Sequence, residues 1–268
     1  MMTTTSLLRR GLVAAAFAAL AGCASGPQAP GAEARAALAP TGKLRVAVDP
    51  GSPTSLVERA PLSRMRGVSV DLGRALADRL GVPMQVEVFP RQQEAFAALQ
   101  RGDADFMVTN ATAERMRVVD FAPPLVALEL GVLVPPGSQV DAVERMDLQG
   151  ITVGVSQGSS SERVLRERLK IAKLRTFPSL DAAVDALRAK EIDAFATNKG
   201  ILYELQARVP ASTVVPGRWG TEHLAPAIPQ GRAAAGLAYL KAFTQEVRDN
   251  GELARAIERA GLRGTAAP

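Results

Sequence analysis

The side chains with the clearest chemistry lie in the stretch "DFMVTNATAER", residues 105–115, where a short apolar run is followed by small polar residues and an arginine. Asn110 and Thr112 can donate or accept hydrogen bonds. Arg115 carries a planar guanidinium, which forms two parallel hydrogen bonds with a carboxylate and stays charged when water is partly excluded. This stretch alone leaves two partners open for Arg115, an anionic ligand or an acidic side chain nearby on the surface.

A second polar cluster, "QGSSSE" at residues 157–162, follows the apolar run "ITVGV" and precedes a helical pattern. Gly158, Ser159 and Ser160 are therefore expected at a turn from a strand into a helix. Free backbone N–H groups and the helix dipole at such a turn favour an anion. A serine that only caps the helix has the same sequence signature, and the two interpretations are compatible.

Strands and helices alternate along the part of the chain that carries these clusters. The stretches "KLRVAVD" and "MQVEVF" are typical of strands, and between them "VSVDLGRALADRLG" repeats apolar residues at helical spacing and ends in Gly81. The same order restarts at "ITVGV". This alternation predicts an α/β protein of two units, each with a largely parallel sheet and helices on both faces.

An internal repeat supports the division into two units. "AFAALQRGDADFMVTN" at residues 95–110 aligns without a gap on "AVDALRAKEIDAFATN" at residues 183–198, and the offset is 88 residues throughout. Asn110 is then equivalent to Asn198, and a chance match is the alternative. If the repeat is real, equivalent strand ends carry equivalent polar residues, at the edge of the sheet where open α/β proteins bind ligands.

The N-terminal residues have the pattern of an export signal. Arg9 and Arg10 precede a twelve-residue apolar stretch, too short to span a bilayer, that ends in "LAGC" at Cys23. We expect residues 1–22 to be a signal peptide, and "LAGC" resembles the bacterial lipobox, in which the cysteine is acylated. An ordinary signal peptide with a chance cysteine is the alternative. Residues 23–41, rich in Ala, Pro and Gly, are expected to form a lipidated flexible tether.

Charge and cysteine content exclude several classes of function. Without residues 1–22, which contain two arginines and no acid, 30 basic residues face 27 acidic ones. This small excess and the scarcity of aromatic residues argue against a nucleic-acid partner. Cys23 is the only cysteine in the sequence, so an internal disulfide and a thiolate metal cluster are excluded. We expect no metal and no cofactor.

Several stretches taken in order resemble the family 3 solute-binding proteins of bacterial amino-acid ABC transporters, over nearly all of residues 42–264. They are "GKLRVAVD", "GVSVDLGRALADRLG", "AALQRGDAD", "TNATAERMRVVDFAPPL", "LQGITVGVSQGSSSE" and "EIDAFATN". The resemblance implies a periplasmic-binding-protein-like α/β fold, with two lobes joined by two crossing hinge strands, here "ELGVLVPP" and "HLAPAIP". Lobe 1 would comprise residues 42–133 and 224–264, and lobe 2 residues 134–223.

The same resemblance implies a binding protein that is not an enzyme. It would close around a small carboxylate-bearing solute, a polar amino acid or a derivative, and deliver it to the permease of an ABC importer. The protein would be a periplasmic or extracytoplasmic monomer, held to the membrane by the lipid on Cys23.

Residue by residue, the resemblance assigns the carboxylate clamp to Arg115, with Asn110 and Thr112 as neighbouring donors. Ser159 and Ser160 would complete the carboxylate site from the second lobe. The loop between Asn110 and Arg115 is two residues shorter than is usual in the family, which affects the reach of the arginine.

Other positions depart from the family. Asn198 stands where an aspartate usually meets the α-ammonium group, and Ser52 and Gln92 stand where an aromatic or apolar side chain is common. The groups that could supply charge instead are Asp49, Glu222 and His223. Asp49 could equally cap a turn, and His223 could be a lone histidine without a role in binding.

Two enzymatic alternatives stay open. "GVSQG" at residues 154–158 matches the nucleophile elbow of α/β hydrolases, and Asp193 and His223 follow Ser156 in the matching order. A dehydratase on the binding-protein scaffold would need a carboxylic acid with a raised pKa in the cleft, and Glu222 is the candidate.

Overall fold

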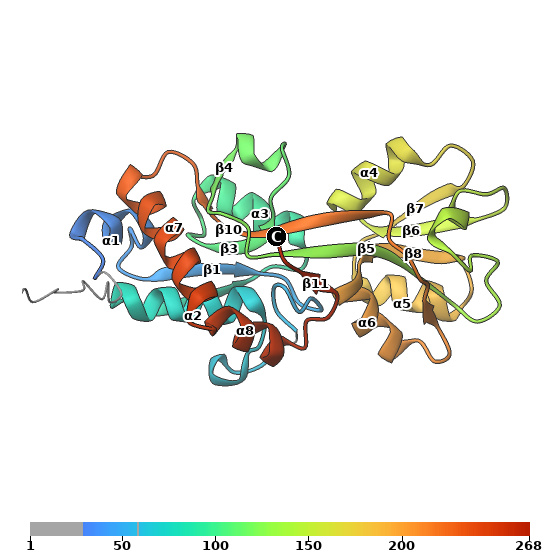
Figure 1. Cartoon of the computed structure of the whole chain (residues 1–268), viewed down its shortest axis with the longest axis horizontal. Coiled ribbons are helices and arrows are strands. Elements are labelled where there is room, and N and C mark those ends of the chain that lie inside the picture. Colours follow the sequence, from blue (N-terminus) through green and yellow to red (C-terminus); the bar gives the residue numbers. More distant parts are fainter. Residues whose placement is uncertain (1–28, 58) are drawn as a thin grey trace, which may run out of the picture.

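The computed structural model describes residues 29–57 and 59–268, so the expected signal peptide and Cys23 lie outside the described residues. Two α/β lobes lie end to end and are joined by a pair of long strands (Figure 1). The predicted fold class is therefore confirmed. In the part of the chain that is described, no helix is both long and apolar enough to cross a membrane.

Lobe 1 begins with a strand–helix–strand unit whose two strands are parallel. β1 (Leu44–Val48) pairs with β2 (Met84–Val88), and α2 (Val68–Leu80) connects them. The apolar residues of α2 that recur at helical spacing are buried against β1. The helix ends at Gly81, which has a φ of 64° and adopts the left-handed conformation that glycine tolerates best.

The rest of lobe 1 carries the turn that contains Arg115, called the arginine turn below, and the C-terminal helices. Its further elements are α3 (Gln92–Arg101), β3 (Met107–Asn110), the short 3-10 helices η1 (Leu62–Arg64) and η2 (Arg115–Arg117), β4 (Val119–Phe121), α7 (Ala234–Asp249) and α8 (Glu252–Ala260). The last two helices return to the core of lobe 1, as the resemblance implied, and bury Leu240, Phe243 and Leu253 there.

Lobe 2 repeats the strand–helix–strand order of elements. β6 (Thr152–Ser156) pairs in parallel with both β7 (Lys173–Phe177) and β8 (Ala194–Asn198). Its helices are α4 (Ser160–Arg168), α5 (Leu180–Arg188) and α6 (Lys199–Arg208), and its small elements are η3 (Val143–Met146) and β9 (Thr213–Val214). α3 and α5 begin 88 residues apart, and β3 and β8 end in the two asparagines that the repeat aligned.

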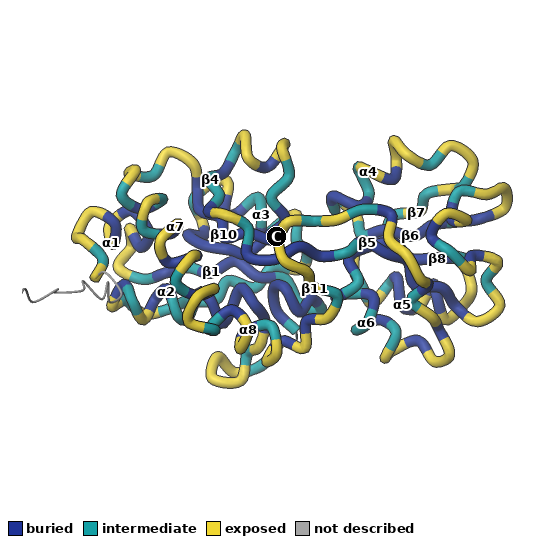
Figure 2. The backbone as a smooth tube through the Cα atoms, in the orientation of Figure 1, coloured by how far each residue is buried: buried dark blue, intermediate teal, exposed yellow. Residues whose placement is uncertain are grey.

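The two hinge strands are β5 (Val126–Val134) and β10 (Gly220–Pro229), which run antiparallel with Leu224 opposite Val126. β10 also pairs with β3 of lobe 1, and β5 with β8 of lobe 2, so one sheet passes through both lobes. The short C-terminal strand β11 (Thr265–Ala266) adds to β5. The buried apolar residues of lobe 1 and of lobe 2 form separate cores. Most residues of β5 and of the second half of β10 are buried in them (Figure 2).

Residues 32–38 differ from the sequence expectation. We expected a flexible tether from residue 23 to residue 41, but Ala32–Leu38 form the helix α1, which packs against α7. Leu38 is fully buried in the lobe 1 core, and Arg232 Nη1 donates a hydrogen bond of 2.6 Å to the carbonyl oxygen of Ala37. The tether interpretation is wrong for these residues, because burial of their apolar face stabilises the helix.

Candidate ligand-binding site

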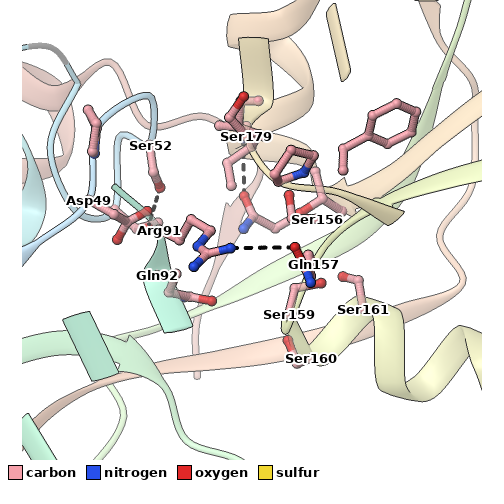
Figure 3. A pocket seen from close by; sticks show the side chains of 18 of the residues that line it. Asp49, Ser52, Arg91, Gln92, Ser156, Gln157, Ser159, Ser160, Ser161 and Ser179 are labelled. Carbon is pink, nitrogen blue, oxygen red and sulfur yellow. Dashed lines mark hydrogen bonds between the residues drawn. The ribbon is translucent and has the colours of Figure 1, made fainter. Parts of the chain in front are cut away.

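A polar cleft lies between the lobes at the carboxyl ends of the strands, with an empty volume of about 720 Å³ that includes open solvent. Figure 3 shows the side chains that face it from lobe 1, Asp49, Ser52, Arg91 and Gln92, and from lobe 2, Ser156, Gln157, Ser159, Ser160 and Ser179. The cleft has the position at which α/β proteins bind small molecules.

Lobe 2 presents the N-termini of three helices to the cleft. Ser159, Ser179 and Asn198 cap α4, α5 and α6, and each side-chain oxygen accepts a hydrogen bond of 3.1 Å from the backbone N–H three residues later. The positive ends of three helix dipoles therefore converge there. Ser159 is thus a capping residue, as one interpretation of "QGSSSE" had it, and the free N–H groups of this helix end still favour an anion.

Lobe 1 contributes Arg115, which is only 5% exposed. Its Nη1 donates to Thr109 Oγ1 at 2.7 Å and to the Asn110 carbonyl oxygen at 3.4 Å, and its Nη2 donates to Gln92 Oε1 at 3.3 Å. The guanidinium also lies 4.7 Å from the centre of the Phe96 ring. Arg115 is therefore not a surface arginine. It lies behind Gln92, which lines the cleft.

The residues beside Arg115 join the lobes. Thr112 Oγ1 accepts a hydrogen bond of 3.2 Å from the backbone of Arg115 and fixes the turn, but Thr112 does not line the cleft. Asn110 is buried, and its Nδ2 donates to Ser160 Oγ at 3.2 Å. Ser160 Oγ in turn donates to Glu222. This series of hydrogen bonds connects β3, the start of α4 and the hinge strand β10.

Two acidic groups line the cleft, and burial raises the pKa of both. The pKa of Asp49 is raised to about 6, against the opposing effects of a hydrogen bond from Ser55 and the charge of Arg115. Burial also raises the pKa of Glu222, although Ser160 and the charge of Arg115 oppose the shift. Among the described residues neither carboxylate forms an ion pair with a lysine or arginine.

The charge of Arg115 is affected by the same two acids. Burial lowers the pKa of the guanidinium, and the negative charges of Glu222 and then Asp49 oppose this. The cleft thus combines one buried cation with two acids whose ionisation is costly without a cationic partner.

Direct contacts across the cleft place the lobes in a closed arrangement. Arg163 of α4 forms an ion pair with Glu114 of lobe 1, and Arg91 Nη1 donates to Gln157 Oε1 at 3.5 Å (Figure 3). Glu114, one of the acids near Arg115 in the sequence, is therefore paired with the other lobe instead.

The hydrolase alternative is wrong. Ser156 ends β6 at the cleft, whereas Asp193 Oδ2 accepts a hydrogen bond of 2.8 Å from the backbone of Thr152, at the other end of that strand. A strand of this length separates the two side chains by about 13 Å. His223 is exposed on β10, whereas its neighbour Glu222 lines the cleft, since adjacent strand residues face opposite ways.

Sequence reasoning missed two features of the site. Ser179 brings a third helix end to the cleft, and its signal was a serine directly before the apolar helical pattern "LDAAVDAL". The cross-lobe contact of Arg91 with Gln157 had no sequence signal, because the two residues meet only after both lobes have folded.

The comparisons with known proteins agree with this architecture. The family described as bacterial extracellular solute-binding proteins, family 3, matches residues 44–261. A probable histidine-binding protein of Neisseria gonorrhoeae is 29% identical over 258 residues, which cover 90% of this chain and 91% of that protein.

Two further matches bear on the range of functions. The membrane-bound lytic murein transglycosylase F of Idiomarina loihiensis is 29% identical over 209 residues, which cover 73% of this chain but only 45% of that relative. The crystal structure of the ancestral amino acid-binding protein AncCDT-1, a precursor of cyclohexadienyl dehydratase, has a TM-score of 0.69 at 26% identity. That match covers 85% of this chain and 98% of the other.

Proposed function

The chain belongs to family 3 of the bacterial extracellular solute-binding proteins, and from this premise we propose that it captures a polar amino acid, or a close derivative, for an ABC importer. The ligand is bound between the lobes and no chemistry is done on it. The amino-acid relatives that match most of the chain support this choice of ligand class.

One observation carries the proposal: a buried arginine lies beside the closed cleft, helix N-termini converge on it, and the two acids that line it form no ion pair with another described residue. This set of charges complements a zwitterion, which brings an anionic and a cationic group together. In the complex we infer, Arg115 exchanges its bond to Gln92 for the ligand carboxylate, since a charged acceptor forms a stronger hydrogen bond than an amide oxygen.

The other groups of the carboxylate subsite come from both lobes. We assign the backbone and side-chain donors to Asn110, Ser159 and Ser160, and Thr112 holds the arginine turn in place. Asp49, Gln92 and Asn198 line the part of the cleft that receives the remainder of the ligand.

Ligand capture requires the lobes to move. We take residues 42–133 with 224–264 as lobe 1 and residues 134–223 as lobe 2, and both rotate about β5 and β10. The ligand drives closure because it contacts donors of both lobes only in the closed form.

The proposed site of action is the periplasm or another extracytoplasmic space, with the monomer tethered through a lipid on Cys23 and docking on its permease. Since α1 is docked on lobe 1, only residues 24–31 separate Cys23 from this helix. Fully extended, these residues span at most about 28 Å. Lobe 1 would therefore be held near the membrane. Mass spectrometry of the native N-terminus tests the anchor, and an unmodified N-terminus beyond Cys23 contradicts it.

Thermal-shift screening of polar amino acids, followed by calorimetry, tests the binding function. Trp219, the only tryptophan in the sequence, donates a hydrogen bond of 2.9 Å from Nε1 to the Gly131 carbonyl oxygen in the hinge, so its fluorescence can follow closure. A protein that binds no amino acid and shows no compaction in solution scattering would sink the proposal.

A dehydratase-type enzyme is the second candidate. The observation in its favour is Glu222, a cleft carboxyl with a raised pKa, which suits a group that protonates a leaving hydroxyl. The likeness to a dehydratase precursor adds to it. Incubation with a hydroxylated cyclohexadiene carboxylate and chromatography for loss of water distinguish the two, because a binding protein returns the solute unchanged.

A further inference from the structure

The two asparagines of the internal repeat meet at one carboxylate, that of Glu222. Asn110 ends β3 and Asn198 ends β8, and the amides of both, with the hydroxyl of Ser160, oppose the effect of burial on the pKa of Glu222. Ser160 Oγ donates directly to the carboxylate, and Asn110 Nδ2 donates to Ser160 Oγ at 3.2 Å. Glu222 itself lies on the hinge strand β10, outside the repeated segments. The carboxylate is thus held by Ser160 of lobe 2, to which Asn110 of lobe 1 donates, at the point where the lobes and the hinge join.

Asn198 cannot itself supply the charge for a ligand ammonium group. Its Oδ1 already accepts the hydrogen bond from the backbone of Ile201, so this oxygen caps α6. The group left to face Glu222 is the Nδ2 amide, which donates hydrogen bonds and would repel an ammonium. Position 198 therefore supports the carboxylate of Glu222 and leaves the ammonium without a countercharge of its own.

The carboxylate of Glu222 has donors but no cation in contact with it within residues 29–57 and 59–268. Glu222 is half-buried, and a partly desolvated carboxylate without a countercharge is costly, so a ligand cation placed against it removes much of that cost. The charge of Arg115 lowers the pKa of Glu222 without a direct contact between the two side chains. Arg115 instead donates to the carbonyl oxygen of Asn110 in lobe 1.

Asp49 is the other acid that could meet an ammonium group, and its position is less suitable. It follows β1 at the lobe 1 wall, beside Ser55, and no side chain of lobe 2 donates to it among the described residues. Glu222 also affects the pKa of Arg115 more strongly than Asp49 does. Because the carboxylate and ammonium of an α-amino acid share one carbon, their partners must lie near each other, which favours the pair Arg115 and Glu222.

We propose that Glu222 is the counter-ion for the ammonium group of the ligand, supplying from the hinge strand the negative charge that Asn198 lacks. The inference rests on the proposed capture of an amino acid and specifies how that ligand is read. It also gives the amides at the two equivalent strand ends a role, since one supports Ser160, which donates to the carboxylate, and both oppose the rise in its pKa.

Calorimetry on the full chain tests the proposal with L-glutamine, L-histidine and L-arginine as probes, each beside its des-amino acid. Glu222→Gln keeps the size of the side chain and should weaken amino-acid binding by roughly 30-fold or more, with a much smaller effect on the des-amino acid. Asp49→Asn is the matched control and should change the affinity for the amino acid less. In the Glu222→Gln background, Asn198→Asp should restore part of the lost affinity.

A pH series separates an electrostatic role from a structural one. Amino-acid affinity of the wild type should fall as pH drops and Glu222 is protonated, and this part of the pH dependence should vanish in Glu222→Gln. Equal affinity of wild type and Glu222→Gln for an amino acid would overturn the inference while leaving the proposed function intact. A larger loss in Asp49→Asn would also overturn it, and a wild type that binds none of the probes would refute both proposals.

Discussion

Replacing Arg115 by alanine removes a buried cation beside the cleft and should affect binding and stability separately. Within the free protein, three hydrogen bonds and the contact with Phe96 are lost. The desolvation that lowers the pKa of this arginine offsets part of that loss. We therefore expect a decrease of about 1 to 3 kcal/mol in the free energy of unfolding.

The effect on ligand binding should be larger. A ligand carboxylate buried without its charged partner loses about 2 to 5 kcal/mol, which corresponds to roughly 30-fold to 5,000-fold in affinity. Arg115→Lys retains the charge but loses the planar fork, and its affinity should lie between those of the wild type and Arg115→Ala.

Calorimetry on folded protein, with denaturant unfolding measured beside it, separates the two effects. Arg117→Ala is the matched control, because Arg117 lies on the same 3-10 turn and is exposed. If Arg115→Ala binds the ligand as tightly as Arg117→Ala does, while its stability falls, then the arginine only supports lobe 1 and the carboxylate-clamp assignment is wrong.

Three further substitutions test closure, charge and the N-terminal helix. Gly158→Ala should lower ligand affinity by about tenfold or more. Gly158 has a φ of 72°, and an added Cβ would collide with Gln93 of the other lobe when the lobes close. Ligand-induced compaction equal to that of the wild type in solution scattering would contradict this. Burial raises the pKa of Asp49 from 3.8 to about 6, so the folded state binds the extra proton, and the free energy of unfolding should fall relative to Asp49→Asn as pH rises through that window, by up to about 3 kcal/mol. Parallel pH curves for the two proteins would refute the shift. Leu38→Ala should cost about 2 to 5 kcal/mol in denaturant unfolding, and Leu62→Ala, which removes a side chain that is 43% exposed, much less; equal losses would mean that α1 is not docked.

The local patterns of the sequence predicted most elements because their causes are local. The helix predicted at residues 68–81 is found at Val68–Leu80, since its apolar spacing and terminal glycine act within a few turns. The hinge strands, expected at residues 129–136 and 223–229, are found at Val126–Val134 and Gly220–Pro229. Here the resemblance to a family gave the pairing, which no pattern within either strand contains.

The remaining features depend on contacts between distant segments. The composition of residues 32–38 is that of a linker, and the helix exists because Leu38 enters a core completed by α7, about 200 residues later. Burial of Arg115 likewise depends on the ring of Phe96 and the amide of Gln92, which α3 brings to it. The sequence could name Arg115, but not the neutral partners that hold it before a ligand arrives.

The repeat predicted two equivalent strand ends, and the structure uses them unequally. Asn110 donates to Ser160 of the opposite lobe, whereas the oxygen of Asn198 caps its own helix. The two strand ends are followed by different basic residues, which lie outside the repeated segments. Arg115 follows β3, whereas Lys199 directly follows β8 and forms an ion pair with Glu129 of the hinge strand β5. Among the described residues, Arg115 therefore has no acidic partner in an ion pair, whereas Lys199 has one. In the binding mode that we propose, Arg115 and Glu222 give the cleft a direction, so a zwitterion should bind in one orientation, because reversing it would set its ammonium against Arg115.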